Sequence, residues 1–336
     1  IRMSPDQKIL VIRFSSIGDI VLATSPLRTI RSAFPDAQIT FLTLDKFSPL
    51  LEFHPDIDRL ISIPSSLKFK KLWTFGAYIK RNKYDIIYDL HNSIRSNIVT
   101  LQSGAQSFQL KKPRFNRMML FHFHENYFES EFSTRFMYHQ HMGSIWDGNH
   151  GSIPKTLLRL SAGEIKKGRR LLSDRGVMGD YVSVIPGAAW KQKRWPVNKY
   201  IETLNNLDIP SVLIGTKDDT ICRQINKGLI NSLDLSGKTD LREALSVIAS
   251  SKHVIGSDTG LVHGAEALGK NVSMILGPTS TETGAGVALP DSKNIQKDIW
   301  CRPCSQNGSV PCYREKQYCM ESITPEEVLN SLQINV

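Results

Sequence analysis

Short apolar runs rich in β-branched residues alternate with helical patterns along nearly the whole chain, and this alternation restricts the fold more than any other feature. We predict buried strands at Lys8–Phe14, 39–44, 85–90, 181–185, 211–214, 253–257 and 272–276. Helical patterns follow most of these runs, and such alternation is typical of parallel sheets covered by helices. Because the pattern occurs once in each half, the sequence predicts an α/β protein with two doubly wound, Rossmann-like domains facing across a cleft.

The chain has 336 residues, which is enough for two domains of ordinary size. A polar, glycine-bearing stretch between Leu160 and Asp180 separates the two halves. We therefore expect a first domain over 1–165, a second over 176–322 and a final helix within 323–336. Thr324, Pro325 and Glu327 combine a helix cap, a first-turn proline and a capping-box glutamate. This helix is expected to pack back on the first domain.

Two further predicted helices have sequence signals that mark where they begin. The pattern from Ile20 to Phe34 contains Pro26, so the helix either kinks there or restarts with Ser25 as its cap. Asp240 and Glu243 have the spacing of a capping box.

A net charge of +10 points to anionic partners, and it leaves nucleic acid, an acidic membrane surface and phosphorylated substrates open. The basic residues form two clusters in the first half: Lys68, Lys70, Lys71, Lys80, Arg81 and Lys83, then Lys111, Lys112, Arg114 and Arg117. Such runs are often only a solvated face, but they make the first half the better candidate for an anionic acceptor. With no apolar stretch of about 20 residues and no secretory signal, we expect a cytoplasmic protein.

The loop after the first strand reads Ser15, Ser16, Ile17, Gly18 and Asp19. In a doubly wound sheet, ligands bind beyond the carboxyl ends of the strands. Gly18 permits a tight turn there. Asp19 is either a helix cap or a general base that takes a proton from an attacking hydroxyl group.

Three loops of the second half have similar positions. Residues 186–196 (PGAAWKQKRWP) deliver Lys193 and Arg194, whose charges suit a diphosphate, although no Walker or GxGxxG fingerprint is present. Asp219 follows the next strand and could accept hydrogen bonds from ribose hydroxyls. Asp258, Thr259 and Gly260 open a helix whose free amides favour an anion.

Together these segments resemble the ADP-heptose:lipopolysaccharide heptosyltransferase family of GT-B glycosyltransferases. The resemblance is carried in order from residue 8 to 329 by SSIGD, KRWP, LSGKTDLREAL, SDTGLVHGAEALG, ILGPT and CRPC…CM…ITPEEV. The cysteine-rich tail is similar to the branch that adds the second or later heptose. The sequence departs from the family at Ser280, where the usual Gly-Pro-Thr-Asp reads Gly-Pro-Thr-Ser.

The resemblance implies an inverting transfer of heptose from ADP-heptose to the lipopolysaccharide inner core, with no cofactor for catalysis. By analogy Asp19 is the catalytic base, with Ser16, Gly18 and Arg95 on the acceptor side. The donor would be held by Lys193, Arg194, Asp219, Asp258, Thr259 and Gly260. It also implies peripheral contact with the anionic inner membrane and no nucleic-acid partner.

Four cysteines crowd the tail at Cys301, Cys304, Cys312 and Cys319. Four thiolates could close a tetrahedral structural zinc site, which leaves no open position for substrate. The alternative is four reduced thiols, or disulfides formed after purification, since the spacing is not that of a zinc finger.

Two other functions stay open. One is a sugar-nucleotide epimerase or hydrolase of the same fold, and the other is a non-catalytic protein that binds anionic membranes or nucleic acid. Residues 111–150 match no motif. If His122 and His124 lie on a strand, they share one face and a metal pair is conceivable, but an acceptor loop or a structural role is the favoured interpretation.

Overall fold

The computed structural model describes residues 7–332, which fold into two compact units. Unit 1 comprises residues up to 112 together with 134–159, and unit 2 comprises 113–133 together with the chain from 160 onward. These ranges differ from the expected domains chiefly at 113–133, a segment that sequence reasoning could not place.

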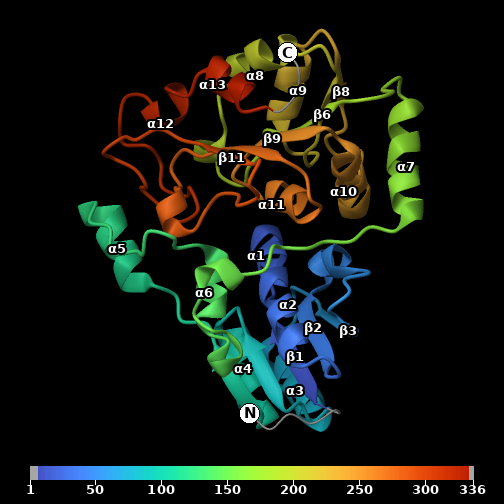
Figure 1. The fold of residues 1–336 in the computed structure, drawn as a ribbon, viewed down its shortest axis with the longest axis vertical. Coiled ribbons are helices and arrows are strands. Elements are labelled where there is room, and N and C mark those ends of the chain that lie inside the picture. The colour runs from blue at the N-terminus through green and yellow to red at the C-terminus, as the bar shows by residue number, and fades with distance from the viewer. Residues whose placement is uncertain (1–6, 333–336) are drawn as a thin grey trace. The chain divides into compact units, whose positions relative to one another are not determined.

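Unit 1 is built on a five-stranded sheet in the order β3-β2-β1-β4-β5, in which every recorded pair is parallel (Figure 1). Its strands are β1 (Lys8–Ile12), β2 (Gln38–Leu44), β3 (Arg59–Ile63), β4 (Ile86–Asp89) and β5 (Gln106–Gln109). Its helices are α1 (Ile17–Leu22), α2 (Thr24–Ala33), α3 (Phe69–Arg81), α4 (Ile94–Ser103) and α6 (Thr134–His139). Strands β3 and β5 escaped the sequence analysis because they are short and partly exposed at the sheet edges.

The helix predicted over 20–34 is two helices, so the restart alternative holds and the kink does not. α1 ends at Leu22 and α2 begins at Thr24, which puts Pro26 in the first turn of α2. Ala23 caps α2 in place of Ser25. The Ser25 hydroxyl instead donates to the carbonyl of Pro154, and this contact ties α2 to the end of unit 1.

Unit 2 is built on a six-stranded sheet in the order β11-β10-β9-β6-β7-β8, again with parallel pairs. Its strands are β6 (Val182–Ile185), β7 (Ser211–Leu213), β8 (Ser232–Asp234), β9 (His253–Ser257), β10 (Val272–Ile275) and β11 (Lys293–Ile295). Its helices are α5 (Arg114–Phe123), α7 (Ala162–Ser173), α8 (Val197–Asn205), α9 (Thr220–Asn226), α10 (Leu241–Ser250), α11 (Gly260–Ala267), α12 (Tyr318–Glu321) and α13 (Pro325–Asn330).

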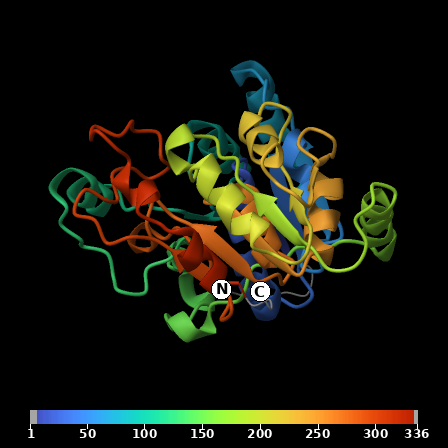
Figure 2. The ribbon, with the colours of Figure 1, turned by 90° about the horizontal axis from the view of Figure 1, so that it is seen from above.

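Helices cover both faces of this second sheet, as the view from above shows (Figure 2). Val182 and Val184 of β6 pack against α8, α9 and α13, whereas Ile185 packs on the opposite face with α10 and α11. Because successive strand residues point to opposite faces, one buried strand supplies both cores. The near-continuous apolar runs in the sequence have this origin.

The predicted capping boxes are confirmed. The Glu243 backbone amide donates to Asp240 at 2.8 Å, and the Thr324 amide donates to Glu327 at 2.8 Å. The helix that Thr324 caps, α13, does not have the expected partner: it packs on α8 within unit 2. Burial of apolar side chains explains this packing, because Val328 of α13 and Leu204 of α8 belong to the same buried cluster.

His122 and His124, which would share a face if their segment were a strand, do not lie on one. His122 lies in the last turn of α5, and His124 ends that helix in the left-handed conformation. His124 meets the ring of Trp300 edge-on, with 5.8 Å between ring centroids. Among residues 7–332, none of the helices combines the length and apolar character needed to cross a membrane.

Candidate active site

In unit 1 the segment Ser15–Asp19 lies where the sequence predicted, at the carboxyl end of the sheet: it runs from the turn after β1 into the first turn of α1. Ser16 caps α1, and Asp19 occupies the third helical position. The Ser16 amide and hydroxyl donate to Asp19 Oδ2 at 3.0 and 2.9 Å. Asp19 is therefore the reciprocal partner of the cap and not the cap itself.

A buried arginine that sequence reasoning missed holds the same carboxylate. Arg13 Nη2 lies 2.9 Å from Asp19 Oδ2. The guanidinium also donates to the carbonyls of Ser15 and Leu90, so it joins β1 to the end of β4. An arginine closing the apolar run KILVIRF was the available signal, because a buried charge needs partners.

These contacts all use one oxygen of Asp19. Among residues 7–332, the other oxygen, Oδ1, has no recorded hydrogen-bond partner. Burial acts to raise the pKa of Asp19, but the Arg13 charge and the Ser16 hydrogen bonds outweigh it, so the pKa lies below its usual value. The side chain is 37% exposed. Asp19 is thus an ionised, oriented carboxylate with one free, accessible oxygen.

Arg95 lies in the first turn of α4, which follows β4, the neighbour of β1. Its Nη1 donates to the carbonyl of Ser65 at 3.1 Å. Buried Asp89 shapes the intervening loop by accepting from the amides of His91 and Asn92 at 3.0 and 2.9 Å. Ser16, Gly18, Asp19 and Arg95 therefore lie at the ends of two adjacent strands, as the topology of a doubly wound sheet requires.

In unit 2 the structure brings two of the predicted donor loops into direct contact. Lys193 Nζ lies 2.6 Å from Asp258 Oδ2, and both side chains are largely buried. Thr279 donates to the same oxygen at 2.9 Å, and His263 Nε2 lies 3.6 Å from Oδ1. Burial acts to raise the pKa of Asp258, but His263 and Lys193 outweigh it and hold the pKa far below its usual range. Thr259 and Gly260 follow as the cap and first residue of α11.

The remaining donor loop, which carries Asp219, also contacts the 186–196 loop, but at Arg194 and not at Lys193. Asp219 accepts from the Thr216 amide at 2.7 Å, and Arg194 Nη2 lies 3.8 Å from its Oδ1. A Cβ atom on Gly187 would come within 2.7 Å of this carboxylate, so the glycine permits the approach. Arg194 also donates to the Ala188 carbonyl at 2.8 Å. Lys193 and Arg194 thus serve two separate carboxylates.

The sequence carries a family match that covers most of the chain. Residues 72–313 match the model of glycosyltransferase family 9 (heptosyltransferase). The chain belongs to glycosyltransferase family 9. This membership confirms the predicted family and the predicted enzyme class.

Relatives and solved structures agree with that placement. Lipooligosaccharide heptosyltransferase 2 of Haemophilus ducreyi is 26% identical over 297 residues, which cover 81% of this chain and 84% of the relative. Lipopolysaccharide heptosyltransferase 2 of Escherichia coli K12 is also 26% identical, covering 82% and 84%. The structure of E. coli ADP-heptose LPS heptosyltransferase II matches with a TM-score of 0.73 and 22% identity over 97% of each chain. This likeness confirms the predicted GT-B fold class.

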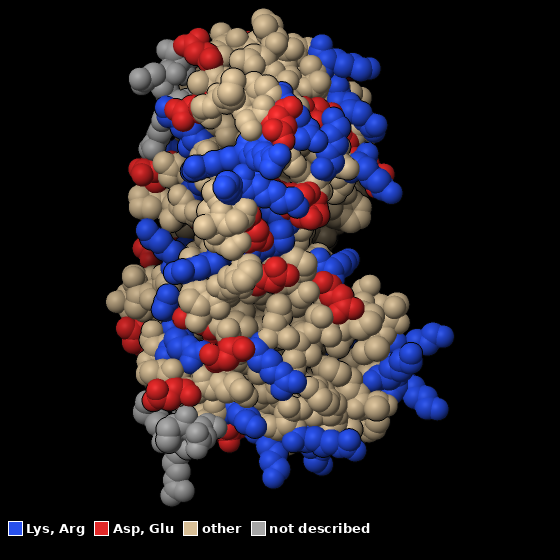
Figure 3. All heavy atoms as spheres, turned by 90° about the vertical axis from the view of Figure 1, so that its right-hand side faces the viewer, with Lys and Arg blue, Asp and Glu red and all other residues tan. Residues whose placement is uncertain are grey.

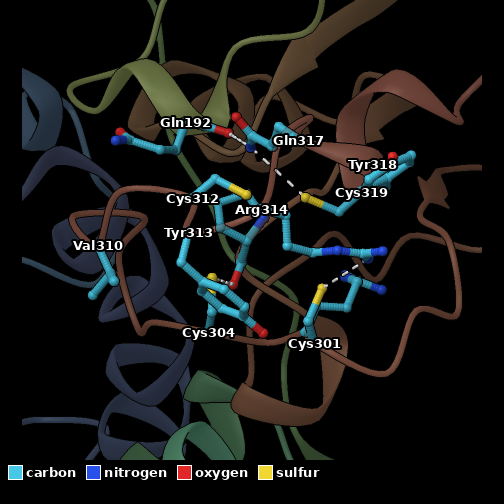
Figure 4. A pocket seen from close by; sticks show the side chains of 12 residues that line it. Gln192, Cys301, Cys304, Val310, Cys312, Tyr313, Arg314, Gln317, Tyr318 and Cys319 are labelled. Atoms are coloured by element: carbon cyan, nitrogen blue, oxygen red, sulfur yellow. Dashed lines mark hydrogen bonds between the residues drawn. The ribbon is translucent and has the colours of Figure 1, made fainter.

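The tail cysteines of this glycosyltransferase line one small cavity of about 20 Å³ (Figure 4). Burial, then the neighbouring cysteines, raises the pKa of Cys304 to about 11. Arg314 Nη1 lies 3.6 Å from Cys301 Sγ. Within the described part of the chain, no three His, Cys, Asp or Glu side chains have the arrangement of a metal site. The four sulfurs therefore share a cavity without forming a coordination shell.

Proposed function

We propose that this glycosyltransferase moves heptose from ADP-heptose to the inner core of lipopolysaccharide, with inversion at the anomeric carbon and no metal in the chemical step. The proposed setting is the cytoplasmic side of the inner membrane, without nucleic acid as a partner. Support comes from the family match and from the activity for which the relatives are named.

The observation that carries the mechanism is the free oxygen of Asp19. In the proposed reaction Asp19 Oδ1 accepts the proton of the attacking acceptor hydroxyl, while Arg13 and Ser16 hold Oδ2. A general base needs an available lone pair in a fixed direction, and this arrangement supplies one. The new bond forms between the acceptor oxygen and the anomeric carbon as the bond to ADP breaks.

The leaving group departs as an anion and needs positive charge. Lys193, Arg194 and the free amides at the start of α11 are the proposed sources. Because Asp258 contacts Lys193, it fixes the position of the ammonium group before the donor arrives. Asp219, near Arg194, is proposed to accept from the ribose hydroxyls.

The test is transfer with purified protein, ADP-heptose and an inner-core acceptor that already carries one heptose, in the presence of a chelator. We expect stoichiometric ADP release and a product of inverted anomeric configuration by NMR. Turnover of the donor alone would favour the epimerase or hydrolase alternative. Neither turnover nor donor binding, with purely salt-dependent binding of anionic polymers, would favour the non-catalytic alternative.

We also propose that the four tail cysteines hold one structural metal ion, with zinc as the expected metal. The support is that all four sulfurs line one cavity and that four thiolates are a donor set typical of structural zinc; binding would require the thiols to lose their protons and move together. The solved structure of TibC matches with a TM-score of 0.59 and 13% identity over 98% of this chain and 76% of that one, and TibC is described as iron-containing. Iron is therefore the second metal to measure.

Metal analysis of protein purified without chelator decides between these assignments. We expect about one equivalent of zinc or iron per chain and few titratable thiols. Substoichiometric metal together with four reactive tail thiols would leave the cysteines as reduced thiols.

A further inference from the structure

The outer surface of α3 and α4 carries large apolar side chains that the core does not use. The inner side of these helices is already filled, since Leu72, Ile79 and Val99 pack against the sheet. On the outer side, Phe69 and Trp73 are 65% and 62% exposed and lie one turn apart on α3. Ile94 and Leu101 on α4 are 70% and 81% exposed and lie two turns apart.

The two helices lie side by side, so these side chains belong to neighbouring parts of one surface. A Cβ atom on Gly76 of α3 would come within 2.7 Å of the Gln102 side chain of α4. At the start of the helices, Arg95 donates to the carbonyl of Ser65, just before α3. We call the outer side of these two helices the α3–α4 surface.

The charge of the α3–α4 surface is strongly one-sided. From Lys68 to Ser103, the stretch that includes both helices, the sequence has seven lysines and arginines but only two carboxylates, Asp85 and Asp89. Asp85 accepts from the Lys8 amide, and Asp89 is buried, so neither offsets the surface lysines.

The basic residues next to the exposed aromatic rings are Lys68, Lys70 and Lys71. Among residues 7–332, none of these three has a recorded ion-pair partner. On the face drawn in Figure 3, the lower half has lysine and arginine side chains at its right and along its bottom edge, and its acidic side chains lie mainly to their left; another basic group lies in the upper half.

We propose that the α3–α4 surface rests on an anionic lipid bilayer. Tryptophan and phenylalanine favour the headgroup region, and lysines beside them gain from the negative surface potential of the membrane. The combination fits lipid better than a nucleic acid, because Ile94 and Leu101 offer no stacking plane for bases.

The placement also suits the proposed acceptor. α3 and α4 begin at the carboxyl edge of the sheet, which is the edge that carries Asp19 and Arg95. A surface seated on the membrane at that edge would bring the loop close to a lipid-linked sugar. This last step rests on the proposed function, whereas membrane binding itself does not.

The test is co-sedimentation of the full chain with vesicles of phosphatidylcholine containing phosphatidylglycerol, against phosphatidylcholine alone. We expect binding to the anionic vesicles that weakens with salt. Lys70→Glu/Lys71→Glu should weaken it at least about tenfold, given the contribution of each basic residue near such a surface. Phe69→Ser/Trp73→Ser should weaken it by about tenfold as well, because the apolar anchors are lost.

Matched controls lie on unit 2. Lys166→Glu/Arg170→Glu on α7 makes the same charge change, and Ile230→Ser removes an apolar side chain that is 89% exposed. Both should keep the vesicle affinity of the parent. Trp73→Phe should retain binding but lose most of the tryptophan quenching by brominated lipid, which reports contact at this residue.

The outcomes separate the two proposals. If the parent binds vesicles and the α3 variants lose this binding, but the parent does not transfer heptose, then membrane binding by the α3–α4 surface is supported and the proposed function is wrong. Efficient transfer with no anionic-vesicle affinity, equal losses in the α7 control, or high-affinity RNA binding in place of vesicle binding would overturn the membrane assignment. The Phe69→Ser/Trp73→Ser variant should transfer normally to a lipid-free acceptor fragment, which shows that it is folded.

Discussion

The guanidinium of Arg13 contacts the carboxylate of Asp19 at 2.9 Å and is itself fixed by the carbonyl of Leu90, at the end of the adjacent strand. The position of Asp19 therefore depends on two strands of the sheet as well as on its own helix. One carboxylate oxygen is fully engaged in this arrangement, and the other is available for chemistry.

Asp19→Asn should abolish most transfer while leaving donor affinity intact. We expect kcat to fall by about 10²–10⁴-fold, because the amide cannot accept the acceptor proton. Stability should fall by about 1 kcal/mol, since the capping box is weakened. ADP release and calorimetric donor binding measure the two effects. Near-normal turnover in the Asp19→Asn variant would reduce Asp19 to a capping role.

Arg13→Gln should move the acid limb of the pH–rate profile upward. The pKa of Asp19 is depressed in the folded protein, so the stability from its ion pair is present above the unfolded pKa of about 3.9. That stability is lost as the pH falls through the folded pKa. Without Arg13, the favourable charge that lowers the pKa of Asp19 is lost, while burial still acts to raise it, so the pKa rises. Profiles of kcat/KM from about pH 4 to pH 8 test this, and unchanged acid limbs would contradict it.

Lys193→Ala should weaken both donor binding and turnover. One preorganised donor to a developing anion contributes about 3 kcal/mol, which corresponds to about a hundredfold in kcat/KM. Lys191→Ala is a matched control, because Lys191 lies two residues earlier on the same loop and is exposed. If both variants behave like the parent in donor titrations and turnover, Lys193 has no place in the donor site.

Raising the salt concentration should weaken acceptor affinity more than donor affinity. Exposed charge pairs are screened beyond a Debye length of about 10 Å at 0.1 M salt, whereas Lys193 is largely buried. Arg95→Ala should raise the KM for the acceptor and reduce its salt dependence. An acceptor KM that does not change with salt, in parent and variant alike, would show that charge does not hold the acceptor.

Short-range capping signals and the alternation of strand and helix patterns predicted the two sheets and several helix ends. Contacts between residues far apart in the sequence could not be predicted in this way. Asp240 and Glu243 lie three residues apart, so their capping box was readable in the sequence. Asp19 was found because it follows a strand. Arg13 was missed because its partner carbonyl at Leu90 is 77 residues away. Likewise Tyr138, whose hydroxyl lies 3.4 Å from the Asp19 carbonyl, comes from the 111–150 segment that matched no motif.

Contact between Lys193 and Asp258 could not be foreseen, because sequence spacing does not tell which loops of a sheet edge meet. The division of labour between Lys193 and Arg194, each beside a different carboxylate, has the same origin.

Gly308, in the cysteine-rich tail, has a consequence for engineering this enzyme. Its φ is +77°, and a Cβ atom there would come within 2.5 Å of Lys193 Cγ. Gln317 of the same tail donates to the Gln192 carbonyl, one residue before Lys193. The tail therefore packs directly against the Lys193 side chain and the backbone next to it. A chimera that takes its tail from one relative and its KRWP loop from another would misplace this lysine, so the two segments have to be exchanged as a single block.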